Sequence, residues 1–126
     1  MSQPIVMFVD DSETALASTK IATPNLPIDV KQYISAGDAL ADINAGIIPN
    51  LIITDLNMPV MNGLEFLAAL RKLAATQKTP VLMLTTEKKD ELKAEGKKLG
   101  LTGWIVKPFN PAQLKQAITR VLRLPA

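Results

Sequence analysis

The stretch IVMFVDDS, residues 5–12, places five consecutive apolar residues directly before two aspartates and a serine. A fully apolar run of this length is typical of a strand that is covered on both faces, as in a parallel sheet. Three further runs of the same kind follow along the chain, at residues 51–53, 81–84 and 104–106. A fifth run, residues 28–34, mixes apolar side chains with charged and amide ones, which indicates an edge strand. We therefore expect five strands.

Segments of helical period lie between these runs. The spacing of apolar residues predicts one amphipathic helix around residues 66–74 and another around residues 114–122. Residues 88–99 predict a weaker helix, because its apolar positions are few and Gly96 lies in its interior. We expect that helix to be marginal and mobile.

The alternation of strands and helices favours a doubly wound α/β fold with a five-stranded parallel sheet, since crossovers between parallel strands are right-handed. Five strands fit the flavodoxin-like order 2-1-3-4-5, in which ligands bind at the carboxyl ends of strands 1 and 3. Those ends carry Asp10, Asp11 and Asp55. The length of 126 residues fits one domain, residues 1–126, and we expect no output domain.

The amino-acid composition excludes several kinds of functional site. The chain has no cysteine and no histidine, which excludes disulfides, thiolate metal sites and a phosphohistidine on this chain. The net charge of +2 is too small to indicate nucleic-acid binding. The apolar runs are far shorter than the roughly 18 residues that span a bilayer, and no signal peptide is recognisable, so we expect a cytoplasmic protein that does not bind membranes.

The fold is expected to bring three carboxylates together, those of Asp10, Asp11 and Asp55. Like charges this close cannot all stay ionised without a cation, and Mg²⁺ suits oxygen ligands at a phosphate-handling site. Taken singly, these residues have plainer roles, because Asp favours helix caps and turns.

Thr85 follows the run at residues 81–84 and Lys107 follows the run at residues 104–106, so we expect a hydroxyl and an ammonium at the same edge of the sheet as the carboxylates. Such a set suits phosphoryl transfer onto an aspartate. The plainer interpretation is a β-branched strand residue for Thr85 and a solvated charge, held extended by Pro108, for Lys107.

Four segments in this order resemble the receiver domain family of two-component response regulators, and CheY-like single-domain regulators in particular. They are FVDDS at 8–12, TDLNMPVMNGLEF at 54–66, PVLMLTTE at 80–87 and GWIVKPF at 103–109. The resemblance covers essentially the whole chain. It implies that Asp55 is the phosphoacceptor and that Thr85 and Lys107 contact the phosphoryl group. It implies a Mg²⁺ site formed by Asp10, Asp11, Asp55 and the backbone carbonyl of Asn57.

The resemblance has further implications for single residues. Thr85 and Trp104 correspond to the switch residues, although Trp104 also fits a plain core position at the sheet edge. Asn57 and Glu87 correspond to positions that tune dephosphorylation. The resemblance also implies a cis peptide bond before Pro108, and a glycine with positive φ at Gly63, in the turn that opens the third helix.

The implied function is a signalling module, not an enzyme beyond its own phosphorylation and dephosphorylation. A sensor histidine kinase or a histidine phosphotransfer protein would donate the phosphoryl group. A downstream protein would bind the face formed by the fourth helix at residues 88–99, the fifth strand at residues 104–106 and the fifth helix at residues 114–122, and we expect a monomer. The lysines of residues 88–98 fit either a solvated helix face or a contact with an acidic partner. Chemotaxis is one response that such a module serves.

Two alternatives are weighed against this function. A haloacid-dehalogenase-like Mg²⁺-dependent phosphatase also combines an aspartate nucleophile with a hydroxyl and a lysine. That family places its nucleophile after strand 1 with a second aspartate two residues on, where this chain has Ser12. A phosphate-independent adaptor of the same fold would typically lack one of the pocket residues.

Overall fold

The computed structural model describes residues 3–21, 23–24, 26–86, 89–107 and 109–124. Five strands alternate with five α-helices and one short 3-10 helix. The strands are β1 (Ile5–Val9), β2 (Asp29–Tyr33), β3 (Leu51–Asp55), β4 (Val81–Thr85) and β5 (Gly103–Val106). The helices are α1 (Glu13–Ile21), α2 (Ala36–Asn44), α3 (Gly63–Lys72), η1 (Ala74–Thr76), α4 (Asp90–Lys98) and α5 (Pro111–Leu122).

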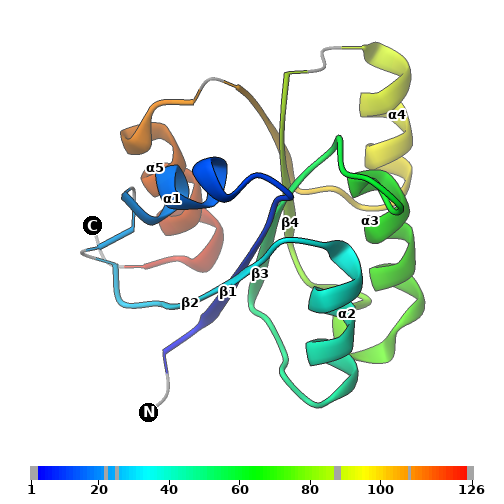
Figure 1. Ribbon diagram of the computed structural model, residues 1–126, viewed down its shortest axis with the longest axis horizontal. Coiled ribbons are helices and arrows are strands. Elements are labelled where there is room, and N and C mark those ends of the chain that lie inside the picture. The colour runs from blue at the N-terminus through cyan, green and yellow to red at the C-terminus, as the bar shows by residue number, and fades with distance from the viewer. Residues whose placement is uncertain (1–2, 22, 25, 87–88, 108, 125–126) are drawn as a thin grey trace.

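All strands pair in parallel in the order β2-β1-β3-β4-β5, which confirms the predicted flavodoxin-like topology. Helices α1 and α5 cover one face of the sheet, and α2, α3 and α4 cover the other (Figure 1). The reversal of chain direction therefore lies between β1 and β3, as the sequence predicts.

The apolar runs of the central strands supply two separate cores. Val6 and Phe8 of β1 pack with Leu114 and Ile118 of α5 on one face. Met7 and Val9 of β1 pack with residues of α2 and α3 on the other face. Because side chains of a strand alternate between faces, a fully apolar run is needed to fill both cores.

The two edge strands are less covered. In β2 the residues are exposed or half-buried, as its mixed sequence predicts. In β5 only Ile105 is buried, although the apolar run at residues 104–106 favours a strand covered on both faces. The difference follows from position, because β5 has a neighbouring strand on one side alone.

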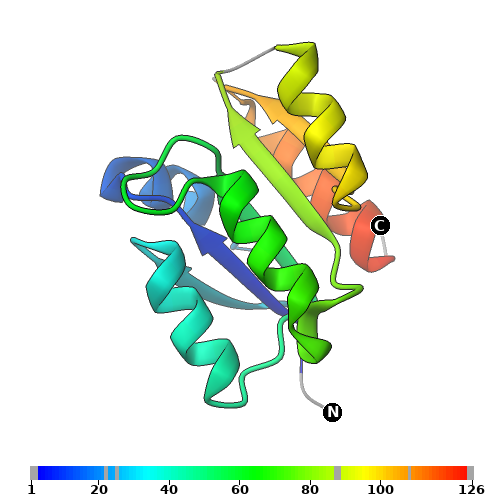
Figure 2. The ribbon, with the colours of Figure 1, turned by 90° about the vertical axis from the view of Figure 1, so that its right-hand side faces the viewer.

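Helix α4 is the least buried of the described helices. Its Gly96 is the one fully buried residue, and an added Cβ there would lie 3.0 Å from Leu101 Cδ2. Figure 2 shows α4 and α3 on the same face of the sheet, where the two helices contact each other. The interior glycine therefore lies at a close contact, where an added side chain would require Leu101 to shift by a few tenths of an ångström.

Gly63 corrects one expectation. It does not have a positive φ; among the described glycines, those with positive φ are Gly46 and Gly100. Gly63 is the first residue of α3, after the N-cap Asn62. A Cβ at this position would lie 2.5 Å from the carbonyl O of Asp55 and 2.6 Å from Met83 Sδ. The glycine is required by lack of space and not by backbone conformation.

The positive φ in this loop belongs to Val60 instead, at 70°. The Met61 amide donates to the Pro59 carbonyl at 2.8 Å, so Val60 forms the centre of a three-residue turn. Its side chain is fully exposed. A β-branched residue in this conformation is strained.

None of the described helices has the length and apolar character that crossing a membrane requires.

Candidate functional site

The strand ends position the polar residues of the site. Asp10 follows β1, Asp55 and Thr85 are the last residues of β3 and β4, and Lys107 follows β5. Because all strands are parallel, these ends meet at one edge of the sheet. The Asp10 amide donates to the Tyr33 carbonyl at 3.0 Å and the Lys107 amide to the Thr85 carbonyl at 2.8 Å, so the sheet pattern extends into the site.

Three carboxylates converge at this edge, as predicted. Asp10, Asp11 and Asp55 each offer an oxygen within 4.8 Å of the others. Asp10 and Asp55 are 5% and 9% exposed, whereas Asp11 is exposed. The Ser12 amide donates to Asp10 Oδ1 at 2.9 Å, and the Leu56 amide donates to Asp55 Oδ1 at 3.0 Å. These bonds fix the two buried carboxylates.

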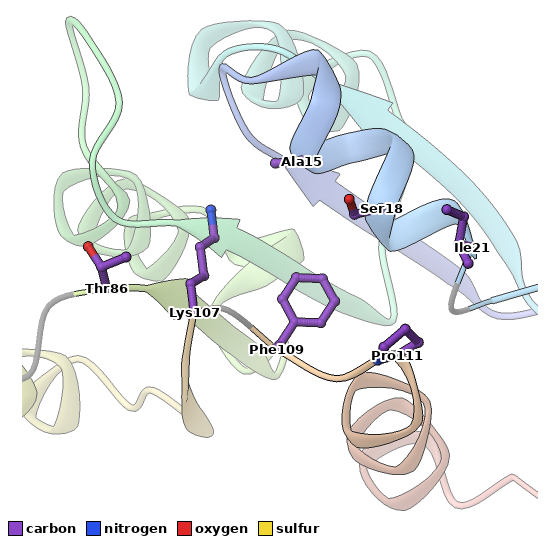
Figure 3. Close-up of a pocket in the computed structure, with 7 residues that line it drawn as sticks. All are labelled: Ala15, Ser18, Ile21, Thr86, Lys107, Phe109 and Pro111. Carbon is purple, nitrogen blue, oxygen red and sulfur yellow. The ribbon is translucent and has the colours of Figure 1, made fainter.

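Lys107 joins the two buried carboxylates. Its Nζ lies 3.1 Å from Asp10 Oδ2 and 3.4 Å from Asp55 Oδ1. The side chain extends from the end of β5 across the edge of the sheet (Figure 3). The ammonium is therefore not the solvated charge of the plainer interpretation.

The electrostatics of the site favour an additional cation. Burial, together with the charge of Asp10, raises the pKa of Asp55, and Lys107 opposes this rise incompletely. Burial lowers the pKa of Lys107, but its hydrogen bond to Asp10 and the charges of Asp10 and Asp55 outweigh burial, so the pKa is raised. The cluster thus holds three carboxylates, and the Lys107 ammonium pairs with two of them, those of Asp10 and Asp55. This all-oxygen donor set fits a hard divalent cation such as Mg²⁺.

Thr85 and Trp104 lie on neighbouring strands, β4 and β5. Thr85 is fully buried at the carboxyl end of β4. Trp104 is half-buried, lies beside Met83 of β4 in the sheet register and packs against the buried cluster that contains Met83 and Leu56, the residue after Asp55. An aromatic side chain therefore packs against a cluster that includes the residue after Asp55.

Three predicted features have less support. Asn57 is exposed in the loop after β3, and no contact tests the role of its backbone carbonyl. Glu87 and Pro108 lie outside the described residues, so the predicted tuning by Glu87 and the predicted cis peptide bond stay predictions.

A hollow next to Lys107 was not predicted from the sequence. It has a volume of about 520 Å³ and lies between α1 and the segment that joins β5 to α5. Figure 3 shows the lining residues: Ala15, Ser18, Ile21, Thr86, Lys107, Phe109 and Pro111. The lining residues come from distant parts of the chain, and no sequence pattern indicates that they meet, so only the fold reveals this surface.

The comparison with known proteins agrees with this geometry. The profile of the response regulator receiver domain matches residues 6–119. Protein PilG of Pseudomonas aeruginosa is 36% identical over 115 residues, which cover 90% of this chain and 83% of PilG. Chemotaxis protein CheY1 of Helicobacter pylori is 33% identical over 118 residues, covering 93% and 95%. The structure of Vibrio cholerae chemotaxis protein CheY4 superimposes with a TM-score of 0.88 at 40% identity, covering 95% of this chain and 99% of CheY4.

Proposed function

The chain belongs to the response regulator receiver domain family, and we propose that it is a signalling switch whose Asp55 accepts a phosphoryl group from a separate protein. The observation that carries this proposal is the meeting of three carboxylates and Lys107 at the carboxyl edge of the sheet. Among the carboxylates, Asp55 is both buried and at the centre of the sheet, on β3.

The proposed step is a phosphoryl transfer from phosphohistidine. An Asp55 carboxylate oxygen forms a new bond to phosphorus, while the bond between phosphorus and the donor imidazole nitrogen breaks. The electron pair of that bond stays on the imidazole, which then takes up a proton from solvent. The chain lacks histidine, so the donor is another protein, a sensor histidine kinase or a histidine phosphotransfer protein. Beyond its own phosphorylation and dephosphorylation, we assign it no enzyme activity.

Mg²⁺ fits this site. Asp10, Asp11, Asp55 and the Asn57 backbone carbonyl would hold it, and its charge would offset the negative charge that develops on the transferred group. The protein's own residues do the rest. Lys107 balances charge on the phosphoryl oxygens, and the Thr85 hydroxyl donates to one of them. Asp10, fixed by the Ser12 amide, holds Lys107 in place.

The output is proposed to be a change in binding of a downstream protein at the face formed by α4, β5 and α5. Trp104 on β5 and Thr85 on β4 are the switch residues in this proposal. The described part of α4 carries lysines and acidic residues side by side, which fits a solvated face as well as an acidic partner. We also propose a cytoplasmic monomer, because the partners of such a switch are cytoplasmic signalling proteins.

Phosphorylation by a small-molecule donor tests the proposal. Acetyl phosphate with Mg²⁺ is expected to add one phosphoryl group to wild type and none to Asp55→Asn, as measured by intact-protein mass spectrometry. Asp29→Asn is the matched control, because Asp29 is an exposed aspartate at the opposite end of the sheet, where β2 begins. Equal labelling of Asp55→Asn would overturn the assignment. Repeated turnover of unrelated phosphomonoesters would favour the phosphatase alternative.

A further inference from the structure

Arg71 of α3 donates to four backbone carbonyls outside its own helix. Nε donates to the Leu99 carbonyl at 2.8 Å, and Nη2 donates to the Gly100 carbonyl at 3.1 Å. Nη1 donates to the carbonyls of Thr76 and Thr79 at 2.9 and 2.8 Å. One guanidinium therefore ties the end of α4 to α3 and to the chain that enters β4.

Backbone hydrogen bonds also cap the carboxyl end of α4, next to the contact with Arg71. The Gly100 amide donates to the Lys97 carbonyl at 3.0 Å, and the Leu101 amide donates to the Gly96 carbonyl at 2.9 Å. Gly100 has a φ of 75°, as the left-handed residue that ends a helix usually does. Arg71 supplies donors and positive charge beyond this end, where a helix leaves carbonyls unpaired.

The amino end of α4 has much weaker attachment. Its N-cap Lys89 makes no side-chain capping bond, and residues 90–95 are exposed except for the half-buried Leu92. Leu92 packs against the buried cluster that Leu56, Leu64 and Met83 form. Leu56 directly follows Asp55, and Met83 lies on β4 two residues before Thr85. The half-buried side chain of this end therefore packs against a cluster that includes residues close in sequence to the phosphoacceptor and the switch threonine.

We infer that Arg71 is a positioning residue that anchors the carboxyl end of α4, so that the site moves this helix through its amino end alone. The second half of this inference rests on the proposed function. Helix α4 then behaves as a lever with a fixed end near Gly100 and a free end near Lys89. A partner that binds α4 would detect the change mainly in the first two turns.

Arginine is specifically suited to this role. Desolvation lowers the pKa of the Arg71 guanidinium, but arginine stays protonated in proteins, so the anchor is charged in every state of the switch. The planar guanidinium reaches carbonyls in three directions, which a lysine ammonium on a flexible stem does not reproduce. We therefore expect Arg71→Lys to restore only part of the anchoring.

Amide hydrogen exchange without ligand tests the anchor. In Arg71→Gln, the amides of Leu99, Gly100 and Leu101 are expected to exchange about tenfold faster than in wild type, with Arg71→Lys in between. Amides of α5 should be unchanged, which separates local release from general destabilisation. Lys72→Gln is the matched control, because it removes the neighbouring exposed cation of the same helix turn. Equal exchange in Arg71→Gln and Lys72→Gln would overturn the inference.

Beryllofluoride with Mg²⁺ tests the lever. In wild type, exchange should change in residues 90–94 and stay within twofold in residues 99–101; in Arg71→Gln both segments should respond. An equal response of both segments in wild type overturns the inference, and this test needs no variant if Arg71→Gln does not fold. If beryllofluoride changes no amide, including those of residues 53–58, the proposed function and the lever fail together. The anchoring role of Arg71 is then still tested by the amide exchange rates of residues 99–101 measured without ligand.

Discussion

Replacing Gly63 by alanine should damage both the stability and the reactivity of this protein. The added Cβ would lie 2.5 Å from the Asp55 carbonyl O, whereas ordinary contact begins at 3.4 Å. The two atoms must therefore separate by roughly 0.9 Å, and the Asp55 oxygen belongs to a central strand that moves little. Met83 Sδ, at 2.6 Å, adds a second close contact in a fully buried side chain. Overpacking of this kind typically costs about 1–3 kcal/mol.

Gly37→Ala provides the matched control. Gly37 lies in the first turn of α2, and the nearest atom to its added Cβ is Ser35 Oγ at 3.9 Å. With space available, alanine in a helix is expected to raise the free energy of unfolding by about 0.5–1 kcal/mol. Urea unfolding followed by circular dichroism should thus give changes of opposite sign for the two variants. Equal changes would refute the argument that Gly63 is required by lack of space.

The same displacement should slow phosphorylation. A shift of about 1 Å in a reacting group costs up to roughly 100-fold in rate, and Asp55 carries both the displaced carbonyl and the proposed nucleophile. We expect Gly63→Ala to be labelled by acetyl phosphate at least about tenfold more slowly than wild type, whereas Gly37→Ala should match wild type. Loss of stability without loss of rate would show that the strain is relieved on the Met83 side.

Three further results are expected. Val60→Asn should raise the free energy of unfolding by about 0.5–1 kcal/mol in urea titrations, because asparagine tolerates a positive φ and the exposed valine side chain gives up no packing. Without divalent metal, Asp55→Asn should be more stable than wild type at pH 7; a carboxyl whose pKa is raised in the folded state loses stability as pH rises through that pKa, so the difference should vanish in acid. Trp104 fluorescence should respond strongly to beryllofluoride with Mg²⁺ and weakly to Mg²⁺ alone; an undiminished response in Thr85→Ala would show that Trp104 senses something else.

The parts of the fold that could be predicted from the sequence are those that depend on continuous local patterns. The apolar run of residues 5–9 indicated β1, and the polar residues that follow the runs identified Asp10, Asp55 and Lys107 at one edge. The partial burial of β5 was missed because an apolar run of three residues does not reveal how many neighbours a strand has. The anchor at Arg71 was missed because its acceptors are backbone carbonyls, which every residue carries and no pattern distinguishes.

Gly63 shows a different limit of sequence reasoning. The positive φ was expected at Gly63 because the residue matches the family's glycine in this turn, where a positive φ costs glycine little. The residue that has it is Val60, three positions earlier, where the side chain points to solvent and meets no obstacle. The space around Gly63 depends on Met83, which lies on another strand. Such a steric clash arises from the packing of α3 on the sheet and cannot be predicted from the residues next to Gly63 in the sequence.

The division of the strands between two cores also protects the site against misfolding. Val9 of β1 lies beside Thr54 of β3 in the native register, and Asp10 and Asp55 come next. If β1 slipped by one residue against β3, Met7 would exchange faces with Phe8, and both cores would receive side chains of the wrong size and shape. The same slip would draw Asp10 one position along the edge, away from Asp55 and Lys107. Misregistered chains should therefore be unstable. The packing of the two cores thus selects the register in which the site carboxylates have the correct spacing.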